Sequence, residues 1–104
     1  MYAGETEYTS EVNSITLTHE GDEYITWTAD GYSEKGYKVV WGKTSGPTYP
    51  TRESDQYVYY SDASTATGEV TAFDGDGTYY VRVCEYLGGE CGVYSNEITV
   101  ELIE

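Results

Sequence analysis

Basic residues, leucine and long apolar runs are scarce in this sequence. Five Lys and Arg residues stand against nineteen Asp and Glu residues among 104, which gives a formal net charge of −14. A chain this acidic repels phosphate backbones and anionic lipid surfaces, so we expect no nucleic acid partner. Leucine occurs only at Leu17, Leu87 and Leu102. No stretch approaches the roughly 18 apolar residues of a membrane-spanning helix, so we expect no membrane insertion.

Groups that carry catalysis or hold a metal are also scarce. The chain has one histidine, His19, and two cysteines, whereas a structural zinc site needs about four ligands and a hydrolytic triad needs a nucleophile, a histidine and an acid in one arrangement. The segment "DGDGTYYVRVCE" imitates a calcium loop through Asp74 and Asp76, but Tyr79 stands where an EF-hand requires glycine. We predict no enzyme activity and no cofactor, and keep Asp74 and Asp76 as a weak calcium candidate.

Tyrosine, glycine and short alternating apolar runs make up much of what is present. Thirteen Tyr and twelve Gly residues, with little leucine, disfavour helices. Apolar residues recur at every second position in short runs between turn-forming clusters, which is typical of half-buried antiparallel strands. The seven runs are residues 14–20, 23–30, 36–43, 56–61, 67–73, 78–86 and 96–102. They predict an all-β, seven-stranded antiparallel β-sandwich of two sheets, because a single sheet would leave one apolar face in water.

The length fits one domain, since about a hundred residues close one hydrophobic core but not two. The opening segment "MYAGETEYTSE", residues 1–11, is acidic and polar. We expect a flexible lead-in or linker there. Residues 12–104 then form the sandwich domain.

Several segments resemble a fibronectin type III domain. "ITWTAD" looks like the second strand of that family, with Trp27 as the core tryptophan, and "GYKVVWGK" is similar to the third strand. "FDGDGTYYVRV" resembles the family signature, with Phe73 at its leucine position and Tyr79 at the tyrosine-corner position. "SNEITV" fits the last strand, with Ser95 at the usual serine. The core predicted from the alternation and the resemblance consists of Trp27, Tyr37, Val39, Phe73, Tyr79, Val81, Val83, Ile98 and Val100.

The resemblance implies a non-catalytic module, secreted or at the cell surface, that serves as a spacer or as an adhesion and protein-binding domain. Its partners would be a protein or glycan at the cell surface, or neighbouring domains of the same chain. Two alternatives stay open: a carbohydrate-binding module accessory to a secreted enzyme, and a self-assembling subunit of a surface structure. A homo-oligomer stays open as well. Residues 43–56, rich in Pro, Thr and Ser, and the two cysteines depart from the usual pattern of the family.

The cysteines lie in "VRVCEYLGGECGVYS" with six residues between them. If Val83 faces the core, Cys84 faces outward, and the alternation of the last strand places Cys91 on the same outer face. Pairing the two directly leaves "EYLGGE" as an exposed hairpin tip, where Gly88 and Gly89 supply positive φ. Opposed strand residues lie within ~5.5 Å, which suits a disulfide. We predict a cross-strand bridge, which implies an oxidising compartment.

The chain holds more tyrosines than one small core can bury. Their rigid amphipathic rings favour protein interfaces and stacking on sugars. Alternation places Tyr80 and Arg82 on the outer face of their sheet, beside Lys38 of the third strand. The candidate binding surface consists of Tyr80, Arg82, Lys38, Tyr59, Tyr86 and Leu87. The competing interpretation is cross-strand aromatic pairing that only stabilises the sheet.

Overall fold

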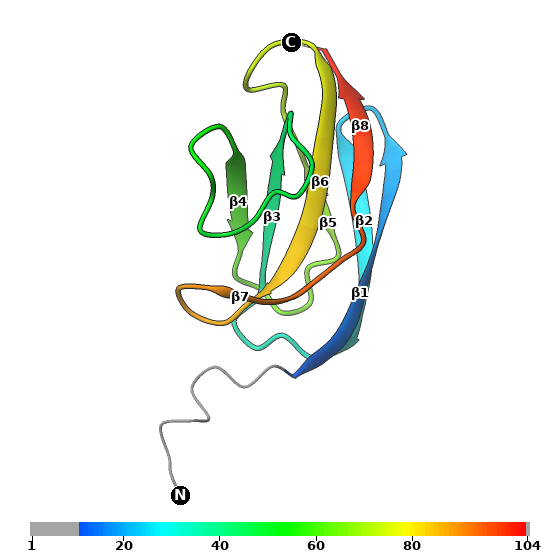
Figure 1. Cartoon of the computed structure of the whole chain (residues 1–104). Coiled ribbons are helices and arrows are strands. Elements are labelled where there is room, and N and C mark those ends of the chain that lie inside the picture. The colour runs from blue at the N-terminus through cyan, green and yellow to red at the C-terminus, as the bar shows by residue number, and fades with distance from the viewer. Residues whose placement is uncertain (1–10, 104) are drawn as a thin grey trace, which may run out of the picture.

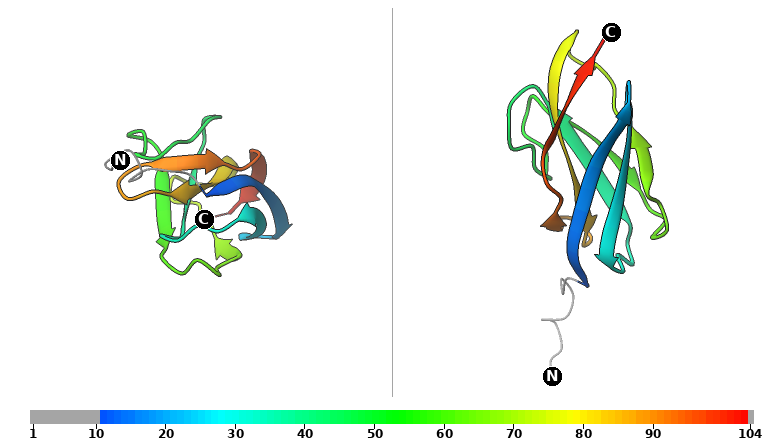
Figure 2. Two further views of the ribbon diagram at one scale, coloured as in Figure 1. Left: turned by 90° about the horizontal axis from the view of Figure 1, so that it is seen from below. Right: turned by 90° about the vertical axis from the view of Figure 1, so that its right-hand side faces the viewer.

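The computed structural model describes residues 11–103, which form eight strands and, within that range, no helix. The strands make two antiparallel sheets packed face to face as two layers (Figures 1 and 2). One sheet has the order β1-β2-β5, from β1 (Val12–Gly21), β2 (Tyr24–Gly31) and β5 (Thr67–Glu69). The other has the order β4-β3-β6-β7, from β4 (Gln56–Tyr60), β3 (Tyr37–Gly42), β6 (Gly77–Tyr86) and β7 (Cys91–Tyr94), with β8 (Ile98–Leu102) also paired to β6.

The all-β, two-sheet architecture predicted from the sequence is confirmed. The expected number of strands is wrong, because the segment after the hairpin pairs with β6 in two separate pieces. β7 pairs near the end of β6, and β8 pairs along Gly77 to Val81. The predicted run 67–73 also shortens to the three residues of β5. The expected lead-in, residues 1–11, lies outside the described residues except for Glu11.

Apolar side chains from both sheets fill the space between the layers. The buried cluster consists of Val12, Ile15, Leu17, Ile25, Trp27, Tyr37, Val39, Trp41, Val70, Tyr79, Val81, Val83, Val100 and Leu102. Two residues expected in the core differ. Ile98 is only partly buried, and Phe73 keeps 36% of its surface exposed. Phe73 lies in a turn beyond β5, where its ring packs against the buried rings of Trp41 and Tyr79 at centroid distances of 6.2 and 5.5 Å.

One carboxylate lies among these apolar residues. Glu85 is 2% exposed, because it continues the inward alternation of β6 after Val83. Its Oε2 accepts a hydrogen bond from the backbone N–H of Glu11 at 2.9 Å, and its Oε1 accepts one from the N–H of Val93 at 3.3 Å. Burial and the nearby Glu85 carboxylate raise the pKa of Tyr37. Glu85 therefore ties the beginning of β1 to β6 and β7, which corrects its expected place in an exposed tip.

A disulfide joins Cys84 and Cys91, whose Cα atoms lie 5.7 Å apart. The predicted bridge is therefore confirmed, but the predicted register is wrong. Cys84 lies opposite Tyr94, and Cys91 lies opposite Tyr86, because a register shift interrupts the pairing between Cys84 and Tyr86. The bridge is diagonal, and it staples the two strands of the hairpin across this irregularity.

The hairpin tip is shorter than expected. The backbone N–H of Leu87 donates to the carbonyl of Glu90 at 2.9 Å, which closes a tight turn. Gly88 and Gly89 occupy the turn with φ of 94° and 106°, as their residue type predicts. Only these four residues therefore project beyond the paired strands.

No helix in residues 11–103 is long and apolar enough to cross a membrane.

Candidate functional site

The side chain of Lys38 lies on the outer face of the second sheet, yet the residue is only 5% exposed. Its direction follows from β3, since its neighbours Tyr37 and Val39 both face the core. Four tyrosine rings surround the ammonium. Nζ lies 4.1 Å from the ring centroid of Tyr49, 4.2 Å from Tyr57, 4.8 Å from Tyr59 and 4.7 Å from Tyr86. We name these four rings the tyrosine cage; at such distances ring faces attract a cation.

Three segments supply the rings of the tyrosine cage. Tyr57 and Tyr59 are alternate residues of β4, and Tyr59 lies directly opposite Lys38. Tyr86 ends β6, and Tyr49 comes from the connection between β3 and β4. The rings meet at steep angles: 66° for Tyr49 and Tyr57, 58° for Tyr59 and Tyr86, and 76° for Tyr49 and Tyr86. Such tilted contacts are favourable for aromatic pairs and hold each ring in place.

The outer side of the tyrosine cage faces solvent. Tyr57 and Tyr59 are 42% and 41% exposed. The Tyr59 hydroxyl donates to the backbone carbonyl of Lys35 at 2.6 Å. Burial raises the pKa of Tyr59, and the neighbouring Tyr86 raises it further. The phenol therefore stays protonated, and keeps this hydrogen bond, throughout the neutral pH range.

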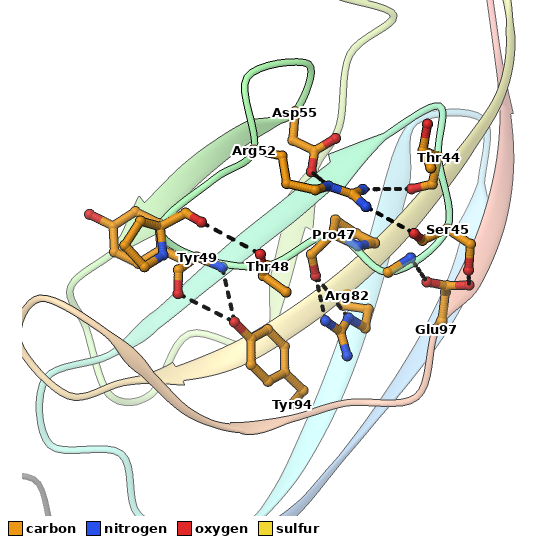
Figure 3. Close-up of polar contacts among 12 residues, drawn as sticks. Thr44, Ser45, Pro47, Thr48, Tyr49, Arg52, Asp55, Arg82, Tyr94 and Glu97 are labelled. Atoms are coloured by element: carbon orange, nitrogen blue, oxygen red, sulfur yellow. Dashed lines mark hydrogen bonds and ion pairs between the residues drawn. The ribbon is translucent and has the colours of Figure 1, made fainter.

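The connection between β3 and β4, residues 43–55, folds back over the outer face of the sheet (Figure 3). Arg82 of β6 holds its middle, because Nε and Nη2 donate to the carbonyl of Pro47 at 2.9 and 2.6 Å. The same guanidinium lies 4.1 Å from the ring centroid of Tyr94. The hydroxyl of Tyr94 in turn accepts the backbone N–H of Tyr49 at 2.9 Å. Arg82 and Tyr94 together therefore position the Tyr49 ring over Lys38.

Charged side chains also hold the two ends of this connection together (Figure 3). Arg52 donates to the carbonyls of Thr44 and Ser45 at 2.8 and 3.1 Å, and it pairs with Asp55 at 2.5 Å. Glu97 accepts the Ser45 hydroxyl at 2.7 Å. The Asp55 side chain is fully buried, so the pair with Arg52 is screened by water on one side only. These contacts give residues 43–55 one defined path, although the segment has no regular secondary structure.

The structure brings together part of the predicted surface. Lys38, Tyr59 and Tyr86 meet in the tyrosine cage, and Arg82 lies beside it through Tyr94. Tyr80 is not part of this group, because it lies opposite Gly42 and Thr99 towards the other end of β6. Leu87 belongs to the hairpin tip and is partly buried.

The binding surface predicted from the sequence did not include three residues that the structure places at the tyrosine cage or beside it. Tyr57 could have been included, since residues two positions apart on a strand, such as Tyr57 and Tyr59, direct their side chains to the same face. Tyr94 lies in a strand that the apolar alternation did not reveal. Tyr49 lies in the irregular connection, and nothing in the sequence places it over Lys38. Its position depends on hydrogen bonds to residues 35 or more positions away.

Asp74 and Asp76, the weak calcium candidate, lie in a turn whose backbone is bonded to the Tyr79 hydroxyl. The Tyr79 hydroxyl donates to the carbonyl of Gly75 at 2.6 Å and accepts the backbone N–H of Asp74 at 2.9 Å. Within residues 11–103 no three His, Cys, Asp or Glu side chains are grouped so that they could hold a metal ion. The turn that contains Asp74 and Asp76 is therefore explained by its contacts with Tyr79.

No protein-family model and no curated protein sequence matches the chain. The tyrosine cage already encloses the ammonium of Lys38, so its interior offers no place for a second cation. What it offers a partner is the outside: two half-exposed phenol rings in fixed positions beside an ordered loop.

Arg82→Lys is expected to loosen this surface while keeping the charge. Lysine cannot reproduce both hydrogen bonds to the Pro47 carbonyl together with the guanidinium contact on the Tyr94 ring, so we expect a loss of about 1–2 kcal/mol in unfolding free energy. The Tyr49 amide should exchange with deuterium several-fold faster. Urea denaturation and amide exchange measure the two effects, with Lys35→Arg on an exposed loop as control. Unchanged exchange at Tyr49 would contradict the positioning role of Arg82.

Proposed function

We propose that this chain is a fibronectin type III-like, non-catalytic module that serves as a spacer or a protein-binding domain. The order of the strands within each sheet supports this proposal, when β7 and β8 are taken as two halves of one interrupted last strand. Further support comes from Tyr79, whose hydroxyl bonds to the backbone four residues upstream in the manner of a tyrosine corner. Trp27 is buried in the core, and the Ser95 hydroxyl accepts the Val83 N–H at 2.9 Å.

We further propose that the module works outside the cell or at its surface. The disulfide between Cys84 and Cys91 supports this placement, because such bonds persist in oxidising compartments. The strongly acidic composition suits a solvated, self-repelling surface. The beginning of β1 and the end of β8 lie at opposite ends of the sandwich (Figure 1). That arrangement suits a domain that separates whatever is attached to its two ends.

The observation that carries the binding role is the ordered, half-exposed outer side of the tyrosine cage. Tyrosine offers a large contact area with few rotatable bonds, and rings already fixed before binding lose little entropy on association. Sugar stacking would favour coplanar rings, but the contacting pairs in the cage are tilted by 58° to 76°. This geometry favours a protein partner over the carbohydrate-binding alternative.

Affinity electrophoresis in gels that contain soluble polysaccharides separates these roles. The proposed function predicts that the wild-type protein migrates without retardation on every glycan tested, and that Tyr57→Ser/Tyr59→Ser migrates identically. Retardation by a glycan that the double variant abolishes would establish the carbohydrate-binding alternative instead. Tyr24→Ser/Tyr32→Ser is the matched control, because it removes two exposed rings outside the cage.

A further inference from the structure

β4 is an edge strand with an unusual composition. It pairs with β3 on one side, and no strand of the described residues pairs with its other side. Its sequence, QYVYY, contains no charge, proline or glycine, although the chain carries a net charge of −14. Natural edge strands are commonly protected by charged side chains, proline or bulges, since an open edge is a template for another strand. β4 has none of these protections.

Backbone alternation shows which groups of β4 point to the open side. The Val83 carbonyl accepts the Ser95 N–H at 2.7 Å, and the Val83 N–H donates to the Ser95 hydroxyl at 2.9 Å, so the backbone groups of Val83 point away from β3. Val39 lies opposite Val83. Its own backbone groups therefore point away from β6 and towards β4, where Val39 lies opposite Val58. Val58 thus directs its N–H and C=O to β3.

The residues on either side of Val58 have the opposite direction. Tyr57 and Tyr59 therefore present two N–H and two C=O groups to the open side of β4. Their side chains both lie on the outer face, at the tyrosine cage. The edge thus combines a short ladder of hydrogen-bonding groups with two half-exposed rings.

The other edges of the sandwich are less available. On β1, the Asn96 side chain accepts the Leu17 N–H at 2.8 Å and donates to the Leu17 carbonyl at 3.0 Å. β5 has three residues, and its Glu69 N–H already donates to the Tyr60 hydroxyl at 3.3 Å. β7 has four residues and a register shift, and β8 carries Glu101. Among the described strands, β4 is the uncharged edge of useful length.

We propose that two copies of this chain associate by antiparallel pairing of their β4 edges, with the two-fold axis at Val58. In this register Tyr57 of each copy lies opposite Tyr59 of its partner copy, and all the outward N–H and C=O groups of these residues bond to one another. Val58 lies against Val58 at the axis. The second sheet would then continue across both copies. The inference depends on the strand edge alone and goes beyond the proposed function.

The edge favours a second copy as the occupant because it is complementary to itself. The two-fold register brings aromatic residues opposite aromatic residues, which stabilises cross-strand contacts. It places no like charges on β4 opposite each other. The net charge of −14 on each copy opposes approach at longer range, so added salt should strengthen the association. Four hydrogen bonds make a small interface, so we expect a weak dimer.

Sedimentation equilibrium of the whole chain at concentrations up to about 1 mM, in low and high NaCl, tests this interface. We expect a monomer–dimer equilibrium whose Kd falls as salt rises. Tyr57→Pro removes an outward N–H in each copy and should raise the Kd at least about tenfold. Tyr57→Ser keeps that N–H while losing the same ring, so it should weaken the dimer less. Thermal unfolding confirms that each variant is folded.

Cross-linking provides a second measurement that does not depend on the proline variant folding. Opposed residues of a non-hydrogen-bonded antiparallel pair have Cα atoms about 4.5 Å apart, which a disulfide can span. Val58→Cys should therefore form a disulfide-linked dimer under mild oxidation, detected by mass under non-reducing conditions. Tyr32→Cys is the control, because Tyr32 is highly exposed but lies outside every strand.

Three results would overturn the proposal. One is a monomer at every concentration and salt, including the case in which only an added foreign strand binds the edge. Another is a dimer that a folded Tyr57→Pro variant leaves unchanged, since a different surface would then be responsible. The third is a Val58→Cys variant that cross-links no faster than Tyr32→Cys.

Discussion

Lys38→Met is expected to lower the free energy of unfolding by about 2–3 kcal/mol, although it replaces a buried charge with an apolar side chain of similar length. Burying an ammonium normally costs free energy unless favourable partners surround it. Here four ring faces lie within 5 Å of Nζ, and each desolvated contact contributes on the order of 1 kcal/mol. Methionine can fill the space but cannot supply the charge that attracts the rings.

Urea denaturation of the two proteins measures this effect, and the near-ultraviolet circular dichroism of the tyrosines should change with it. The matched control is Lys43→Met, because the Lys43 ammonium lies 5.5 Å from one ring centroid, that of Tyr79. We expect the control to lose less than about 1 kcal/mol. A Lys38→Met variant as stable as the wild type, or more stable, would show that the cage holds Lys38 by hydrophobic packing alone.

Glu85→Gln is expected to destabilise the sandwich by about 2–3 kcal/mol, because the carboxylate is a buried acceptor with charge-assisted hydrogen bonds. Both oxygens are used: Oε2 by the Glu11 N–H and Oε1 by the Val93 N–H. An amide has one oxygen and one NH2 group, so one backbone donor would face another donor. The beginning of β1 should then separate from β6 and β7 more readily than the rest of the fold.

Amide exchange locates this effect, and urea denaturation gives its size. The N–H groups of Glu11 and Val93 should lose protection by a larger factor than amides in the middle of β3. Glu90→Gln is the control, because Glu90 is exposed in the hairpin tip and its backbone carbonyl, not its side chain, closes the turn. If Glu85→Gln unfolds at the same urea concentration as the wild type and the Glu90→Gln control, the Glu85 carboxylate does not stabilise the sandwich in the way described.

The fold was predictable because its signal is local. Alternation within a strand decides which residues face the core. Val81 and Val83 could therefore be assigned to the core without knowledge of the rest of the chain. The same alternation placed Lys38, Tyr80 and Arg82 on an outer face. It also predicted that Cys84 and Cys91 could meet, which the structure confirms.

The alternation of side-chain directions along a strand no longer predicts which residues meet where the strand is irregular. The register shift in the β6–β7 hairpin moves Cys84 opposite Tyr94, although direct pairing with Cys91 was expected. The predicted core position of Phe73 is wrong for a different reason, because it came from the resemblance to the family signature, whereas the chain turns after β5 and leaves the ring 36% exposed. For the cysteines, the alternation was extended past the point where regular pairing ends.

By itself, the sequence determined an all-β, two-layered domain, its disulfide and the outward direction of Lys38, because each follows from period-two alternation over a few residues. Only the tertiary structure decided that Lys38 is enclosed. The ring of Tyr49 reaches it because Arg82 and Tyr94 fix an irregular loop through contacts between residues far apart in the sequence. Such contacts depend on the packing of several segments at once, and no local pattern encodes them.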